Sequence, residues 1–193
     1  MDQRSPPEFI LEAFADPSTV RDVVRGILHT IFFHRFFPSV QPQTREVLDL
    51  TLPLVDDVEL ETMIDQRAAA LARQLDAAQS HQHHPSGGGR GQISVQFFEK
   101  KRRKTWLAMR GDEEVCWEWW TVKVTVAEPR TESERAKVRK ATEATLLTTT
   151  TKIITFVNTH KDHIPPITTT ESNPFPYQIT VNQKESNFRM GMY

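Results

Sequence analysis

Histidines are the side chains of this sequence whose grouping could hold a metal ion. His81, His83 and His84 lie within four residues of one another, next to three consecutive glycines. A structural zinc site needs about four ligands in a closed, fixed geometry. No cysteine lies near this segment, and its glycines favour a flexible backbone. We therefore expect a solvated connection here, without a metal site.

The other histidines do not suggest catalysis either. His29 and His34 are five residues apart on a predicted helix, so they do not share one face. We expect them to cap the core or to pack at its edge. His160 and His163 flank the end of a later predicted helix, where a cation suits the helix dipole. The glycine run 87–91 lacks the strand-before, helix-after setting of a nucleotide loop. We expect no enzymatic activity and no cofactor.

A run of basic residues could contact the phosphates of nucleic acid or of anionic lipids. It consists of Lys100, Lys101, Arg102, Arg103 and Lys104. Three acids at 112–114 partly neutralise it, and the formal net charge of -1 provides no whole-molecule attraction for polyanions. We favour a solvated strand end that discourages edge-to-edge pairing, and we expect no nucleic-acid partner. A nucleic-acid or anionic-lipid binding module is the alternative.

The four tryptophans lie in two different sequence contexts. Trp106 and Leu107 lie in the middle of a charged loop. Such an apolar tip can dock in a pocket of a partner, or it can fold back and become buried. Trp117, Trp119 and Trp120 begin a predicted strand, where side chains alternate in facing, and we expect them in the core or on a strand face.

The composition is that of a single globular domain. The 193 residues are 38% hydrophobic and 25% charged, which excludes a disordered chain. Cys116 is the sole cysteine, so no internal disulfide can form and a reducing compartment is expected. No apolar run is long enough for a transmembrane segment, and the N-terminus lacks a signal-peptide pattern. These features predict a cytoplasmic or nuclear protein.

Apolar periodicity predicts the elements of the N-terminal half. A short strand spans 9–14, and a helix begins at Asp16-Pro17, with the carboxylate at the N-cap and proline at the first helical position. Alternating leucines at 46–52 indicate one half-buried strand. A second helix follows Asp56 and Asp57, either of which could cap it.

The C-terminal half begins with a flexible connection at 80–92. Two strands follow, and the TESE capping box at 131–134 then starts a third helix that ends near His160. A last strand is expected at 175–181. This order predicts an α+β fold, in which helices cover one side of an antiparallel sheet.

Five segments together resemble the autophagy-related protein 101 family, in order over about residues 9–181. They are VVRGILHTIFFHR, GQISVQFFEKKRRKTW, WEWWTVKVTV, TESER and FPYQITV. The resemblance implies one HORMA domain over 1–193, a mainly antiparallel sheet with three helices packed on one side. It assigns 80–92 to a flexible internal loop, and the short tail 183–193 suits a member that pairs side by side without a closing "safety belt".

The resemblance also implies a role as an adaptor subunit of the autophagy-initiating protein kinase complex. The family pairs with the HORMA domain of autophagy-related protein 13, stabilises it, and recruits downstream autophagy factors at the phagophore assembly site. Its projecting "WF finger" maps onto the loop 100–114, and its tryptophan maps onto Trp106. The family's second aromatic is missing here, so Leu107 or Met109 would supply that contact.

Overall fold

The computed structural model describes residues 5–37, 41–81, 88–102, 112–168 and 173–182. The elements are, in chain order, β1 (Glu8–Ala15), α1 (Val20–Phe33), β2 (Pro42–Val47), β3 (Leu50–Val55), α2 (Val58–His81), β4 (Gly88–Arg102), β5 (Asp112–Ala127), α3 (Glu132–Thr159) and β6 (Tyr177–Val181). One sheet has the order β1-β5-β4-β6, and β2 and β3 form a separate hairpin. The predicted α+β class is confirmed, with β1 lying parallel to β5 and all other pairs antiparallel.

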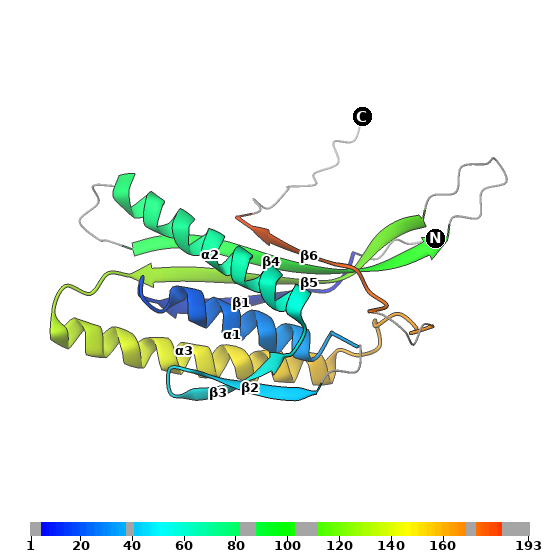
Figure 1. The fold of residues 1–193 in the computed structure, drawn as a ribbon, viewed down its shortest axis with the longest axis horizontal. Coiled ribbons are helices and arrows are strands. Elements are labelled where there is room, and N and C mark those ends of the chain that lie inside the picture. The colour runs from blue at the N-terminus through cyan, green and yellow to red at the C-terminus, as the bar shows by residue number, and fades with distance from the viewer. Residues whose placement is uncertain (1–4, 38–40, 82–87, 103–111, 169–172, 183–193) are drawn as a thin grey trace.

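The helices cover one face of the sheet, and the opposite face is open (Figure 1). Side chains of β1 alternate between buried and exposed positions, as expected for a strand that faces a core on one side only. Helix α1 is buried over the whole stretch 23–32 because it lies between the sheet and the β2–β3 hairpin. A helix that is buried all round forms the centre of a core.

Helix α1 begins later than the sequence predicted. Its first residue is Val20, three residues after the predicted first position Pro17. The Asp16 carboxylate accepts hydrogen bonds from the backbone N–H groups of Ser18 (2.8 Å) and Thr19 (2.9 Å). Burial raises the pKa of Asp16, but the hydrogen bonds from Ser18 and Thr19 outweigh it and leave that pKa below its usual value. These are the bonds of an N-cap, and the Val20 N–H also donates to the Asp16 carbonyl at 3.0 Å, so the predicted capping role of Asp16 is confirmed for the turn that leads into α1.

The single strand expected at 46–52 is two strands joined by a turn. Val47 pairs with Leu50, and Leu48, which lies between them, adopts a left-handed φ of 54°. A two-residue turn preserves the alternation of side chains, so the leucine pattern continues across it. Tight hairpin turns usually contain Asn-Gly or Asp-Gly, whereas this turn consists of Leu48 and Asp49.

The caps of α2 and α3 formed as expected. The backbone N–H of Leu60 donates to the Asp57 carboxylate at 2.9 Å, so Asp57 rather than Asp56 caps α2. Thr131 and Glu134 form the reciprocal capping box of α3. The threonine-rich middle of α3 stays helical, and the Thr150 hydroxyl there donates to the backbone carbonyl four residues before it.

Candidate protein-interaction surfaces

The buried carboxylate of Glu118 links three parts of the chain through hydrogen bonds. Glu118 lies two residues before Trp120 and therefore faces the core on the same side of β5, next to a bulge in the β4–β5 ladder, and it is fully buried. Arg35 Nε, just after α1, donates to both Glu118 oxygens at 2.9 and 3.0 Å. Trp120 Nε1 donates at 2.5 Å, and His163 Nε2 lies 2.7 Å away. The end of α1, strand β5 and the segment after α3 are thereby fixed to one another.

Sequence reasoning missed Glu118 and its partner Arg35. In the run WEWW the glutamate lies two residues before Trp120, so strand alternation places it on the same face as Trp120, but a carboxylate is rarely buried without a partner. Arg35 is 83 residues away in the chain, and no local pattern links the two. The spacing of two residues between Glu118 and Trp120 was the signal in the sequence that the position is buried.

The histidines have structural roles within the described residues. His29 lies inside the core, not at its edge as expected, and its Nδ1 atom accepts from the Val55 backbone N–H at 3.4 Å. Burial and the charge of Arg35 lower the pKa of the half-buried His34. His81 is the last residue of α2, while His83 and His84 lie outside the described residues.

Two kinds of site have no counterpart in the described ranges. No group of three or more His, Cys, Asp or Glu side chains is placed there to hold a metal ion. Nor does any described helix combine the length and apolar character needed to cross a membrane.

The strand tryptophans pack as predicted. Trp120 is fully buried, with its ring centroid 4.6 Å from that of Phe9. Trp117 is buried against Phe175 at 4.9 Å, and Trp119 is half-buried on the open face of the sheet. Trp120 packs against Phe156 of α3, and Trp117 packs against Phe97 and Phe175, so these two tryptophans are part of the framework.

Strands β4 and β5 continue beyond the sheet as a two-stranded arm (Figure 1). Their pairing extends to Arg102 and Asp112, whereas β6 stops opposite Phe97 and β1 opposite Trp119. The strands therefore reach into the segment 100–114 that the sequence assigned to the loop. The predicted finger residues Trp106, Leu107 and Met109, like Arg103 and Lys104, lie outside the described residues.

Acidic residues face the described part of the basic cluster. The register pairs Lys100 with Glu114, Lys101 with Glu113, and Arg102 with Asp112. Lys101 Nζ also lies 2.7 Å from Glu99 Oε1. Opposite charges on directly opposed strand positions stabilise the pairing and offset each other's field. The arrangement favours a solvated strand end over a site for polyanions.

Helix α3 exposes a pair of large apolar side chains. Leu147 is 55% exposed and Ile154 47% exposed. They are seven residues apart, which places them on one helix face, with the exposed Thr151 between them. The adjoining face, which includes Leu146 and Ile153, is in the core. An exposed apolar pair on a rigid helix is a candidate docking surface for a protein partner.

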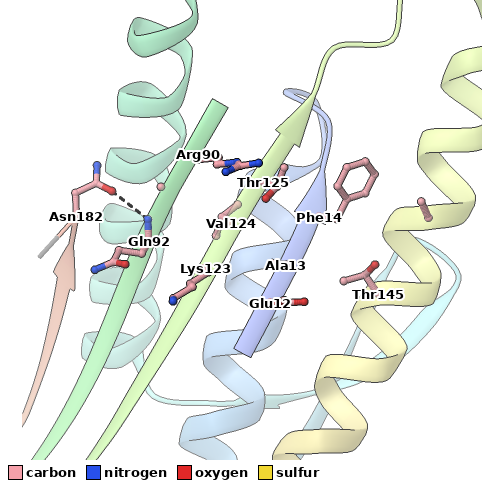
Figure 2. Close-up of a pocket in the computed structure, with 12 residues that line it drawn as sticks. Glu12, Ala13, Phe14, Arg90, Gln92, Lys123, Val124, Thr125, Thr145 and Asn182 are labelled. Carbon is pink, nitrogen blue, oxygen red and sulfur yellow. Dashed lines mark hydrogen bonds between the residues drawn. The ribbon is translucent and has the colours of Figure 1, made fainter. Parts of the chain in front are cut away.

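A groove of about 1030 Å³ lies on the open face of the sheet, beside the N-terminal half of α3 (Figure 2). Among the residues that line it are Glu12 and Phe14 from β1, Lys123 and Thr125 from β5, Arg90 and Gln92 from β4, Ala141 and Thr145 from α3, and Asn182. The groove is separate from the Leu147–Ile154 pair, because Thr145 and Leu147, two residues apart, project to opposite sides of α3.

The comparisons with known proteins agree on one family. The family model described as "Autophagy-related protein 101" matches residues 12–171. The chain is 28% identical to "Autophagy-related protein 101" of Arabidopsis thaliana, over 90% of this chain and 86% of that protein. It is 27% identical to the protein of the same name from Schizosaccharomyces pombe, covering 82% and 77% of the two chains. The corresponding human protein is 26% identical, with coverage of 83% and 75%.

The family match spans most of the described structure, from β1 to beyond the end of α3. It includes the arm, the buried Glu118 network and the exposed face of α3. The α+β architecture with three helices agrees with the HORMA domain that this family implies. The chain belongs to the autophagy-related protein 101 family.

Proposed function

We propose that this chain is a non-enzymatic adaptor that pairs with the HORMA domain of autophagy-related protein 13 within the autophagy-initiating protein kinase complex. Membership of the autophagy-related protein 101 family is the observation that carries the proposal, and it supports an autophagy-related role. Such a role suggests protein partners, so the chemistry required is surface complementarity and not catalysis. The pairing stabilises the partner, because a ligand of the folded form shifts the folding equilibrium by mass action.

The pairing surface in this proposal is the exposed face of α3. Leu147 and Ile154 offer apolar area on a helix that is held from behind by the core. Both side chains are already about half buried, so covering the rest contributes roughly 1 kcal/mol each, about half the value for a fully exposed side chain. A rigid helix also loses little conformational freedom on binding, which leaves more of that free energy for affinity.

A second contact in the proposal is the finger at the end of the β4–β5 arm. The arm extends β4 and β5 beyond β1 and β6 (Figure 1), and the predicted finger residues lie in the sequence between its two strands. Trp106 is the anchor, and Leu107 or Met109 takes the place of the family's second aromatic. Through this finger the chain recruits downstream autophagy factors at the phagophore assembly site.

The test is co-purification with the HORMA domain of autophagy-related protein 13 from the same organism, followed by size-exclusion chromatography with mass determination. A stable one-to-one complex is expected, and Leu147→Asp should abolish it. Val58→Asp is the matched control, because Val58 is 79% exposed and belongs to α2, not to α3. Two separate folded monomers at micromolar concentration would refute the pairing.

The finger is tested separately with Trp106→Ala. The variant should keep the one-to-one complex but fail to restore autophagic flux in cells that lack the endogenous protein. Delivery of a cytosolic reporter to the lytic compartment is the readout. If Trp106→Ala instead disrupts the complex, the division of labour between the helix face and the finger is wrong.

A further inference from the structure

The groove on the open face of the sheet is not used by the proposed pairing through α3 or by the finger. Its floor is formed by the outward side chains of β1, β5 and β4, and its wall by α3 (Figure 2). The wall residues Ala141 and Thr145 are small, which leaves the space open. Residues 132–141 of α3 include none that is buried, so this half of the helix extends beyond the core.

The groove is held by rigid elements on both sides. The Thr149 hydroxyl of α3 donates to the Glu12 carbonyl of β1 at 2.5 Å and fixes the wall against the sheet. On the other side, Asn182 donates from its N–H to the Gln92 carbonyl at 2.7 Å and accepts the Gln92 N–H at 3.0 Å. A ligand that binds here does not have to order the floor first, so the groove is preorganised.

Gly91 allows β4 to lie close to α2 at this point. A Cβ atom at that position would approach Leu71, Leu75 and the Asn182 side chain to 3.1 Å each. The close approach fixes the backbone of the strand that carries Arg90 and Gln92. The positions from which their side chains enter the groove are therefore set by packing, not by a loop.

The side chains over the floor leave an excess of positive charge. Arg90 and Lys123 are exposed, and neither has a salt-bridge partner within 4.0 Å in the described structure. Figure 2 shows Arg90 reaching from β4 over β5, and Lys123 pointing away from Glu12. Glu12 is the one carboxylate among the described lining residues. Two cations and one anion leave a net charge of +1, on the β4–β5 side.

We propose that this groove binds an acidic segment of a protein partner. Carboxylate or phosphoryl side chains of that segment pair with Arg90 and Lys123, and an apolar side chain packs against Phe14 and Ala141 on the α3 side. A nucleic acid fits less well, because a continuous row of phosphates would bring like charge to Glu12, at the edge of the wall. Discrete acidic side chains separated by an apolar one match the distribution of charge in the groove.

The test uses a fluorescein-labelled peptide, Glu-Glu-Phe-Glu-Glu, and the neutral analogue Gln-Gln-Phe-Gln-Gln, with fluorescence anisotropy as the readout. The acidic peptide should bind the full chain, and its binding should weaken as salt rises towards about 0.5 M. The double variant Arg90→Gln/Lys123→Gln should bind roughly tenfold more weakly, as expected for the loss of two exposed ion pairs. Arg67→Gln/Lys140→Gln removes the same charge from exposed sites outside the groove and should bind like the wild type.

Charge reversal gives a gain-of-binding control. Arg90→Glu/Lys123→Glu should bind Lys-Lys-Phe-Lys-Lys, which the wild type should not bind. Leu147→Asp should leave binding of the acidic peptide unchanged, which separates this proposal from pairing through α3. The proposal is overturned by equal affinity of the Arg90→Gln/Lys123→Gln variant and the wild type. It is also overturned if the wild type does not bind at about 1 mM peptide, or binds only an oligonucleotide or phosphatidylserine vesicles.

Discussion

At the scale of single residues, His29 makes the stability of the fold depend on pH. Burial, together with the charges of Arg25 and Arg45, lowers the pKa of His29 from 6.5 to about 4. Below pH 6.5 the unfolded chain binds a proton at this residue that the folded chain does not bind. The free energy of unfolding therefore falls as pH drops from 6.5 towards 4, by on the order of 3 kcal/mol. At pH values above 6.5 this residue has no effect on stability.

Replacing His29 with Asn tests this contribution, because Asn keeps an acceptor near the position of Nδ1 but does not titrate. Urea unfolding at pH 7 and at pH 4.5 gives the free energy of unfolding of both proteins. The wild type should lose more stability between the two pH values than His29→Asn. Equal losses would mean that His29 is protonated in the folded state without cost.

The buried ion pair of Arg35 and Glu118 is a second feature at the scale of single residues. Glu118 is fully buried and Arg35 is 3% exposed, so neither charge has water as an alternative partner. Arg35→Met should destabilise the fold by about 3–5 kcal/mol, because it leaves a buried carboxylate without its countercharge. Adding Glu118→Gln to Arg35→Met should restore part of that loss, since the amide carries no charge. Chemical unfolding of the single and double variants decides between rescue and further damage, and further damage would contradict the electrostatic account.

At the scale of elements, Gly26 determines how closely the β2–β3 hairpin packs on α1. A Cβ atom at Gly26 would lie 2.8 Å from Leu52 Cδ1 and 3.3 Å from Val47 Cγ2. Gly26→Ala should cost roughly 1–3 kcal/mol by overpacking, reduced by about 0.5–1 kcal/mol from the better helix propensity of alanine. The expected net effect is a loss of stability at a position where alanine would otherwise help.

A double-mutant cycle identifies the cause. Leu52→Val removes the Cδ1 atom that the new methyl group would meet, so Gly26→Ala should cost less in the Leu52→Val background than in the wild type. Thermal and urea unfolding of the four proteins give the coupling free energy, expected at about 0.5–3 kcal/mol for residues in contact. A coupling near zero would mean that the hairpin moves freely to accommodate alanine.

The elements that the sequence predicted well are those whose ends carry local chemistry. Thr131 and Glu134 are three residues apart, and their capping box follows from that spacing alone. The turn at Leu48 gave no local signal, because a leucine in a left-handed conformation is uncommon. Glu118 was missed for another reason: its burial depends on Arg35, which joins it only in the folded chain. The groove likewise depends on the placement of α3 beside β1, which no segment encodes by itself.

At the scale of the whole molecule, the candidate surfaces lie on different elements around one framework. The proposed pairing face is on α3, the groove is on the open side of the sheet, and the arm extends from β4 and β5. The Glu118 network ties the base of the arm to α1 and to the segment after α3. In the proposed function, surfaces on different elements let the chain hold several partners at once without competition among them.

This separation predicts that partner binding at the pairing face and peptide binding in the groove are independent. Leu147→Asp should abolish the complex with the partner HORMA domain and leave the affinity for the acidic peptide at the wild-type value. Arg90→Gln/Lys123→Gln should do the reverse. In the wild type, the affinity for the peptide with and without saturating partner domain should differ by less than about 0.5 kcal/mol, as for sites that share no contacts. By reciprocity, a larger difference would mean that the peptide also changes the affinity for the partner domain. Binding in the groove would then be coupled to α3 through the folded core. The Arg35→Met variant, which breaks the ion pair with Glu118, should lose this coupling if the Glu118 network transmits it.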